Sequence, residues 1–495
     1  MVLCTACTEN TVIVRPVIDI PVNDTAQATG LDTITLSVAH AGASDDIASA
    51  TFTRGDTIEL PNVPFGDDLV VHMLGRIGSD ELAYGRTCQF AVRPDEPTPT
   101  PHLFFSRIVR FGHMSQQPLP RLGGVAMTYR DGSGLLIGGS FPDPETQAPQ
   151  ALTQIERFDP NTGAYDTLHE VERRIDAAVA IVGTGADSRM VIVGGADPAT
   201  GLGAEFVEVI EAERDTDRQY ERFFEPAMAR TELTATTLSD GNAVVIGGLR
   251  PGNPTGSPPL LPEASASVFK ISVETGPTAI IQEDATLTYP RYAHTATRLT
   301  DDFGAAVLVA GGLDNAGKPV AQAELFKSLA NDFSTQFTAQ MIVPRWQHQA
   351  VRFPDGSVLF YGGLTKRINP VTMAEETVVV DELELYSPLD GRFLPAGTLR
   401  ANHPRIGMSA TTLPDGRVLI TGGQITIDGP PIDSSFFAVL DPKGGTVRVI
   451  NTDPLATPRS GHQATALCDG TILVAGGSLD PAPFERYNPV AAGRR

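Results

Sequence analysis

The sequence predicts an all-β protein in which a repeated β-hairpin occupies most of the chain. Apolar and polar residues alternate mainly with a period of two, which is typical of half-buried strands. No long stretch has the 3.6-residue periodicity of an amphipathic helix. A third observation is a motif that recurs seven times and is bounded by an arginine and a glycine pair. With 495 residues, the chain is long enough for a large repeat array and a further domain.

The copy at residues 345–363, RWQHQAVRFPDGSVLFYGG, illustrates the motif. Residues 349–353 and 357–361 are the two expected strands of a hairpin, and Asp355-Gly356 is the turn between them. We expect positive φ at both turn residues, because an Asp-Gly pair suits the tightest hairpin turns. Gly362-Gly363 ends the second strand and would let another segment of backbone approach closely.

The motif keeps its spacing along the chain. The step from the arginine to the first glycine is 17 residues in five copies and 20 in the copies that begin at Arg174 and Arg291, where the extra residues fall at the turn. Successive glycine pairs lie 51 to 64 residues apart. The opening arginines are Arg121, Arg174, Arg230, Arg291, Arg345, Arg405 and Arg459. A glutamate recurs in the expected third strand, as Glu156, Glu208, Glu324, Glu384 and Glu485, and Ser267 and Ala438 take its place in copies three and six.

These residues and spacings resemble the kelch-repeat family of β-propellers, which includes the central domain of galactose oxidase. The resemblance implies a seven-bladed kelch-type β-propeller over residues 103–495, with one four-stranded sheet per blade. The seventh copy ends without a fourth strand. We expect the apolar segment 103–111 to supply that strand, so that the two ends of the array close the ring.

The residues before the array have a different organisation. Residues 11–93 lack the repeat, and their short alternating runs predict a small β-sandwich that resembles immunoglobulin-like or transthyretin-like domains. Residues 94–102 are rich in proline and predict a semi-rigid linker that projects the array away from the sandwich. Residues 1–10 resemble the remnant of a lipoprotein export signal, with Cys7 as the lipidation candidate. The Cys4-x-x-Cys7 pair alone is weak evidence for zinc or for redox chemistry.

Composition narrows the class of partner. The formal net charge of −22 would repel nucleic acid and anionic lipid. No run of apolar residues is long enough for a membrane-spanning helix. We therefore expect an exported monomer in the bacterial cell envelope or exterior, with a membrane tether only through a lipid on Cys7.

Two sets of side chains are candidates for a site. The seven repeat arginines, together with Trp346, could form an anion-binding mouth. Their recurrence in every copy favours a structural role instead, in which each arginine pairs with a repeat glutamate. His294, His348 and His462 follow three of the arginines and could ligate a metal, but histidine is common at this position in kelch repeats, so we expect no metal.

The predicted function is non-catalytic binding of a protein or glycan, without a cofactor. The loops between second and third strands vary most in sequence and would share one face with the arginine segments. One alternative is a copper radical oxidase like galactose oxidase, in which two tyrosines, two histidines and a tyrosine–cysteine link form the metal site. Tyr292, His294 and His348 come closest to that pattern, but the spacing departs from it and no cysteine is suitably placed. A structural envelope protein is the other alternative.

Overall fold

The structure is a computed structural model, and the prediction of an all-β chain is confirmed. It describes residues 11–25, 30–58, 62–143, 145–211, 220–252, 262–273, 279–327, 332–399, 403–413, 415–441, 445–479 and 484–489. The helical elements bounded within these ranges are single 3₁₀ turns such as Pro226–Met228. No helix in this part of the chain is long and apolar enough to cross a membrane.

The repeat region contains seven four-stranded antiparallel sheets among the described residues. Each arginine motif forms the first two strands of one sheet. The first strands, here called the inner strands, are β12 (Val125–Thr128), β18 (Ala178–Val182), β22 (Thr234–Thr237), β28 (Thr295–Arg298), β32 (Gln349–Arg352), β38 (Ser409–Thr412) and β42 (Gln463–Ala466). The second strands are β13 (Gly134–Ile137), β19 (Arg189–Val193), β23 (Ala243–Ile246), β29 (Ala306–Ala310), β33 (Val358–Tyr361), β39 (Val418–Thr421) and β43 (Ile472–Ala475).

The outer half of each sheet comes from the more variable sequence. The third strands are β16 (Gln154–Asp159), β20 (Phe206–Ile210), β26 (Ser267–Val273), β30 (Gln322–Lys327), β36 (Glu382–Ser387), β40 (Ser435–Leu440) and β44 (Glu485–Asn488). The fourth strands are β17 (Ala164–Glu170), β21 (Tyr220–Phe224), β27 (Ala279–Thr286), β31 (Asp332–Gln340), β37 (Arg392–Thr398), β41 (Val447–Asn451) and, in the seventh sheet, β11 (Arg110–His113).

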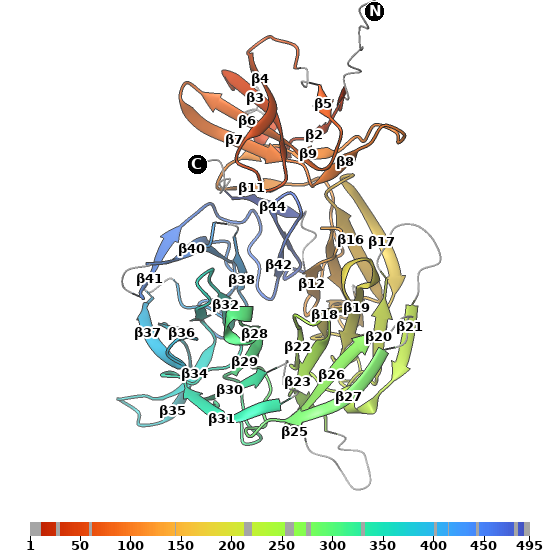
Figure 1. The fold of residues 1–495 in the computed structure, drawn as a ribbon. Helices are drawn as coiled ribbons and strands as arrows, with labels where there is room; N and C mark the ends of the chain where they lie inside the picture. The colour runs from red at the N-terminus through yellow and green to blue at the C-terminus, as the bar shows by residue number, and fades with distance from the viewer. Residues whose placement is uncertain are drawn as a thin grey trace, which may run out of the picture.

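The inner strands lie next to one another in chain order, and β42 also lies next to β12 (Figure 1). Apolar side chains fill the space between each pair of successive sheets, as Leu308 and Phe360 do between the fourth and fifth. The first and last sheets share such a core as well, where Leu136 packs near Leu473 and Phe484. The array is thus continuous from its last sheet back to its first.

The Asp-Gly turns differ from the prediction in one respect. Gly132 has φ of +80°, but Asp131 is not among the residues with positive φ. The amide of Gly132 donates to the carbonyl of Tyr129, and the amide of Tyr129 donates to the carbonyl of Ser133. This is a type I turn followed by a left-handed glycine in a bulge, and the Asp131 side chain accepts the amide of Ser133. The Asp therefore acts through its carboxylate and needs no positive φ.

The N-terminal unit contains a six-stranded antiparallel sheet in the order β10-β7-β6-β3-β4, with β8 also paired to β6. There are also two two-stranded sheets: an antiparallel one of β1 and β5, and a parallel one of β2 and β9. The strands are β1 (Thr11–Val12), β2 (Val17–Asp19), β3 (Thr33–His40), β4 (Asp46–Thr53), β5 (Val63–Pro64), β6 (Gly66–Ile77), β7 (Asp80–Arg86), β8 (Phe90–Val92), β9 (His102–Phe104) and β10 (Ser106–Arg107).

The single strand predicted at 103–111 is wrong in its extent. Residues 102–107 form β9 and β10, which pair with strands of the N-terminal unit, and only β11 pairs with β44. The reason is apolar burial, because Leu103 and Phe105 belong to the core of the N-terminal unit. The boundary between the two regions therefore lies near residue 108.

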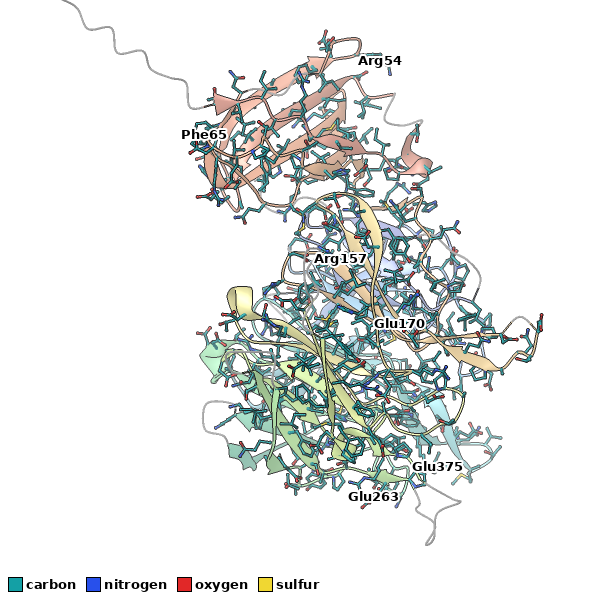
Figure 2. The ribbon with its side chains drawn as sticks, turned by 90° about the vertical axis from the view of Figure 1, so that its right-hand side faces the viewer. Arg54, Phe65, Arg157, Glu170, Glu263 and Glu375 are labelled. Atoms are coloured by element: carbon teal, nitrogen blue, oxygen red, sulfur yellow. A yellow bond between two sulfur atoms is a disulfide. The ribbon has the colours of Figure 1, made fainter. Side chains whose placement is uncertain are left out.

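The N-terminal unit also packs directly on the repeat region, contrary to the predicted projection by the linker (Figure 1). Cys88 and Cys468 form a disulfide between the two regions. The side-chain amide of Asn488 donates to the carbonyls of Tyr84 and Ser106. Figure 2 shows Arg54 at the end of the molecule opposite to Glu263 and Glu375, so the N-terminal unit covers one side of the repeat region.

Candidate functional site

The seven repeat arginines are enclosed in the protein. Their exposed fractions are only 0–2%. In every copy the Nη1 atom donates to the carbonyl of the first glycine of the pair, at 2.7–3.3 Å. The amide of the second glycine donates to the carbonyl of the next copy's arginine, and Gly477 donates to Arg121 of the first copy. The arginines thus join successive sheets and are not presented to an anionic ligand.

The glycine pairs are required by this close approach. Both glycines have positive φ in every copy, as in Gly362 at +62° and Gly363 at +84°. A β-carbon on Gly362 would lie 2.3 Å from the carbonyl oxygen of Arg405. Any other residue at Gly362 would therefore be strained and would also separate two sheets.

Five of the arginines pair with a buried glutamate of the third strand. The pairs are Arg121–Glu156, Arg174–Glu208, Arg291–Glu324, Arg345–Glu384 and Arg459–Glu485. The carboxylate also accepts amides from the segment before the arginine, as Glu384 does from Ile342 and Val343. These contacts satisfy both charges, which burial would otherwise penalise heavily.

Copies three and six replace the glutamate with an aromatic ring. The predicted substitutes, Ser267 and Ala438, are wrong, because the register of the second and third strands places Phe269 and Phe436 at the glutamate position. The guanidinium carbon of Arg230 lies 5.1 Å from the centre of the Phe269 ring, and that of Arg405 lies 4.5 Å from the centre of the Phe436 ring. A cation–π contact thus stands where the other copies have an ion pair.

Trp346, the other predicted binding residue, is 8% exposed and packs with Leu364 and Ile406. Its backbone bridges to Leu364, at the start of a variable loop. The Trp346 side chain therefore packs beneath the loop that begins at Leu364 and offers little exposed surface to a ligand.

The three predicted histidines serve the contacts between sheets. Nε2 of His294 lies 3.0 Å from Oγ1 of Thr234, and Nε2 of His348 lies 2.9 Å from Oγ1 of Thr295. The other edge of the His348 ring packs against Gly311 of the preceding copy. Burial lowers the pKa of His294 and of His462 to about 3, so both rings are neutral.

The copper ligand set does not fit this arrangement. The backbone of Tyr292 forms a β-bridge with Leu313. The Nε2 atoms of His294 and His348 are already in hydrogen bonds with threonine hydroxyl groups of neighbouring strands. Cys88 and Cys468 are bonded to each other, so neither is available for a link to a tyrosine. Within the described ranges, no group of three or more His, Cys, Asp or Glu side chains is placed to hold a metal ion. Cys4 and Cys7 lie outside those ranges.

A feature that the sequence analysis missed lies two residues after each arginine. These seven residues, here called the entry ring, are Gly123, Asp176, Glu232, Ala293, Gln347, Gly407 and Gly461. All seven have positive φ, between +51° and +70°. Neighbouring members contact one another, because the amide of Asp176 donates to the carbonyl of Gly123 and that of Gln347 to the carbonyl of Ala293. The entry ring precedes the inner strands, at the base of the variable loops.

Four members of the entry ring depart from glycine, and they occupy consecutive copies. Positive φ costs a non-glycine residue roughly 1–2 kcal/mol. The side chains of Asp176 and Gln347 are exposed, and that of Glu232 is partly exposed. The repeat thus loses its symmetry where polar groups reach solvent, a pattern that is typical of a functional site.

The carboxyl groups of Asp176 and Glu232 both have raised pKa values. Desolvation by the surrounding protein raises the pKa of Glu232, and the nearby charge of Asp176 raises it further. Asp176 keeps contact with solvent, yet protein atoms crowd its carboxyl group and raise its pKa as well. The pKa of the neighbouring Tyr292 is raised by burial and by Glu232. This side of the entry ring is therefore rich in hydrogen-bonding groups and repels anions.

Variable loops surround the entry ring. Three of them form hairpins: β14 (Ser140–Pro142) with β15 (Pro149–Ala151), β24 (Leu249–Arg250) with β25 (Glu263–Ala264), and β34 (Leu364–Ile368) with β35 (Glu375–Val379). A groove of about 570 Å³ separates β35 from the loop of the sixth copy, and its lining includes Arg367, Asp381, Ile425, Ile427 and Asp428.

Comparisons with known proteins add little to this picture. No protein-family model matches the chain, and no curated protein matches it either. Among solved structures, the chain is similar to one titled "Structure of YjhT", with 14% sequence identity and a TM-score of 0.46. That similarity covers 68% of this chain and 99% of the other.

Proposed function

We propose that the repeat region is a seven-bladed kelch-type β-propeller that binds a glycan on its loop face, without catalysis. Three observations support the propeller. The arginine–glycine hydrogen bonds run through all seven copies and return to Arg121, the inner strands follow in a closed order, and a core joins the last sheet to the first. The motif spacing is that of kelch repeats.

The observation that carries the binding role is the asymmetry of the entry ring. Glycine would be the unstrained residue at all seven positions, yet Asp176, Glu232 and Gln347 are retained where their side chains reach solvent. Carboxylate and amide groups suit the hydroxyl groups of a sugar. Because the repeat arginines are buried, an acidic sugar would meet carboxylates without a compensating cation from the repeat. We therefore favour a neutral glycan over an acidic one.

The proposed setting is the bacterial cell envelope or exterior. The Cys88–Cys468 disulfide supports export, because such bonds persist mainly in oxidising compartments. We propose lipidation at Cys7 as a tether and a monomeric state. Labelling of cells with a radioactive fatty acid, compared between the wild type and Cys7→Ser, tests the tether, and light scattering tests the oligomeric state.

The binding proposal is tested on an array of immobilised neutral and acidic oligosaccharides. We expect the full-length protein to bind neutral members, and we expect the triple variant D176G/E232G/Q347G to lose at least about tenfold in affinity, which corresponds to 1.4 kcal/mol. Ala293→Gly is the matched control and should bind as the wild type does. A wild type that binds nothing, or a triple variant that binds equally well, would contradict the proposal.

A further inference from the structure

The Cys88–Cys468 disulfide joins two residues that are 380 positions apart. Cys88 follows β7 of the N-terminal unit, and Cys468 lies in the turn between β42 and β43. These two strands belong, with β44 and β11, to the sheet that combines both ends of the repeat region, here called the closing sheet. The bond therefore attaches the N-terminal unit to the one sheet that no continuous stretch of chain builds alone.

Further contacts from the N-terminal unit reach the same sheet. Arg86 donates through Nη2 to the carbonyl of Cys468 and through Nε to that of Asp469, both at 2.9 Å. The guanidinium carbon of Arg486 in β44 lies 3.9 Å from the centre of the Phe104 ring. Together with the hydrogen bonds of Asn488, these contacts hold the turn and β44 against the N-terminal unit.

The two cysteine residues differ in exposure. A cleft of about 630 Å³ between the N-terminal unit and the repeat region is lined by Cys88, Cys468, Gln89, Phe90 and Arg130, among other residues. Cys88 is only 4% exposed, whereas Cys468 is partly exposed. We therefore expect a thiolate that enters the cleft from solvent to attack Cys468 and not Cys88.

We propose that this disulfide is a redox-sensitive latch on the closing sheet. A dithiol reductant attacks Sγ of Cys468, the bond between Cys468 and Cys88 breaks, and Cys88 leaves as a thiolate that takes up a proton from water. The second thiol of the reductant then attacks the mixed disulfide and releases Cys468, so that the protein gains two thiols and the reductant becomes a disulfide. The latch concerns the closing sheet and is independent of the proposed glycan site.

Opening of the latch leaves the hydrogen bonds of Arg86 and Asn488 in place, so the fold persists but the closing sheet is held less firmly. The pairing of β11 with β44 joins segments from opposite ends of the repeat region, and such pairing depends on the contacts that hold those ends together. Local opening of these two strands should therefore become more frequent, while sheets on the far side of the array remain unaffected.

The access step is tested on the full chain in a C4S/C7S background, in which only Cys88 and Cys468 remain. We expect dithiothreitol without denaturant to reduce the bond, detected as two alkylated cysteines by mass spectrometry. A bond that stays intact until the protein is unfolded would overturn the proposed sensitivity. Two free thiols in protein purified from an oxidising compartment would overturn the bond itself.

The consequence is tested by hydrogen exchange on the same background and on a form that also carries C88S/C468S. We expect amides of β11 and β44 to exchange at least about tenfold faster in the reduced protein and in the serine variant. Amides of β33 and β36 in the fifth sheet are the internal control and should not change. The melting temperature should fall by about 3–8 °C. Unchanged exchange of β11 and β44 in both forms would overturn the latch, whatever happens to the melting temperature.

Discussion

Replacing the polar members of the entry ring with glycine should weaken glycan binding without lowering the free energy of unfolding. Asp176, Glu232 and Gln347 have φ of +53°, +52° and +51°, a region that costs a non-glycine residue roughly 1–2 kcal/mol. Glycine removes this strain but gives the unfolded chain more freedom, which offsets about 0.4–1 kcal/mol. The net change in the free energy of unfolding should therefore lie between about 0 and 1.6 kcal/mol in favour of the variant at Glu232 and Gln347. At Asp176 it should be smaller, because aspartate tolerates positive φ better than most residues.

Ala293→Gly gives the matched measurement, because Ala293 has φ of +54° and no polar group to lose. Urea unfolding followed by circular dichroism measures stability, and the fluorescence of Trp346, the one tryptophan of the chain, reports on the segment beside the entry ring. We expect all four single glycine variants to be at least as stable as the wild type, and only the three polar ones to weaken glycan binding.

Two results would refute this reasoning. A loss of more than about 1 kcal/mol in the polar variants but not in Ala293→Gly would mean that the side chains stabilise the fold, so that their strain is offset locally. Equal loss of binding in Ala293→Gly would mean that backbone rigidity of the entry ring, and not its polar groups, determines affinity.

Three further predictions concern the contacts that join the sheets. Glu384→Gln should lower the free energy of unfolding by about 3–5 kcal/mol, because Arg345 is left buried without a counter-charge. Phe436→Leu, in a copy that has no ion pair, should lower it by only about 1–2 kcal/mol. Equal losses of the two variants in urea unfolding would contradict this distinction. The buried His294, His348 and His462 all have folded-state pKa values below the unfolded value, so their contribution to stability is complete above pH 6.5 and is lost as pH falls. For His294 and His462, whose folded-state pKa is about 3, lowering the pH to 5 should cost about 2 kcal/mol each. A stability unchanged between pH 7 and pH 5 would refute this. Gly362→Ala should cost well over 2 kcal/mol, whereas Gly317→Ala, at similar φ in open space, should cost about 1 kcal/mol in thermal unfolding.

Much of the repeat region could be predicted because the hydrogen bond between each arginine and the first glycine of its pair fixes their spacing in the sequence. The arginine and the first glycine sit at a set distance along one hairpin, so an insertion is tolerated only at the turn, as the copies at Arg174 and Arg291 show. The glutamate partners were also predictable from their recurrence. Phe269 and Phe436 were missed because a carboxylate and an aromatic ring have no chemical likeness in a sequence, although both can face a buried guanidinium.

The connection between the two regions could not be predicted in the same way. The segment 103–111 reads as one apolar strand, but apolar character alone does not say which core it fills, and Leu103 and Phe105 complete the core of the N-terminal unit. The disulfide was equally hidden, because its cysteines lie far apart in sequence and only the packed structure brings them together. The entry ring did leave a signal, since glycine at one position of the motif is replaced by Asp, Glu, Ala and Gln in four consecutive copies.

The division between buried and exposed positions explains where this repeat can vary. Each arginine must reach a glycine carbonyl and offer its own carbonyl to the neighbouring sheet, so a change in one copy would disturb two sheets. The residue two positions later shares the same backbone requirement for positive φ, but where it is not glycine its side chain is at least partly exposed. A protein of this design can therefore change the chemistry of one face at a cost of roughly 1–2 kcal/mol per position while the contacts between sheets stay the same. The departures from glycine in copies two to five are such changes, and for this reason they identify the part of the loop face where a ligand should bind.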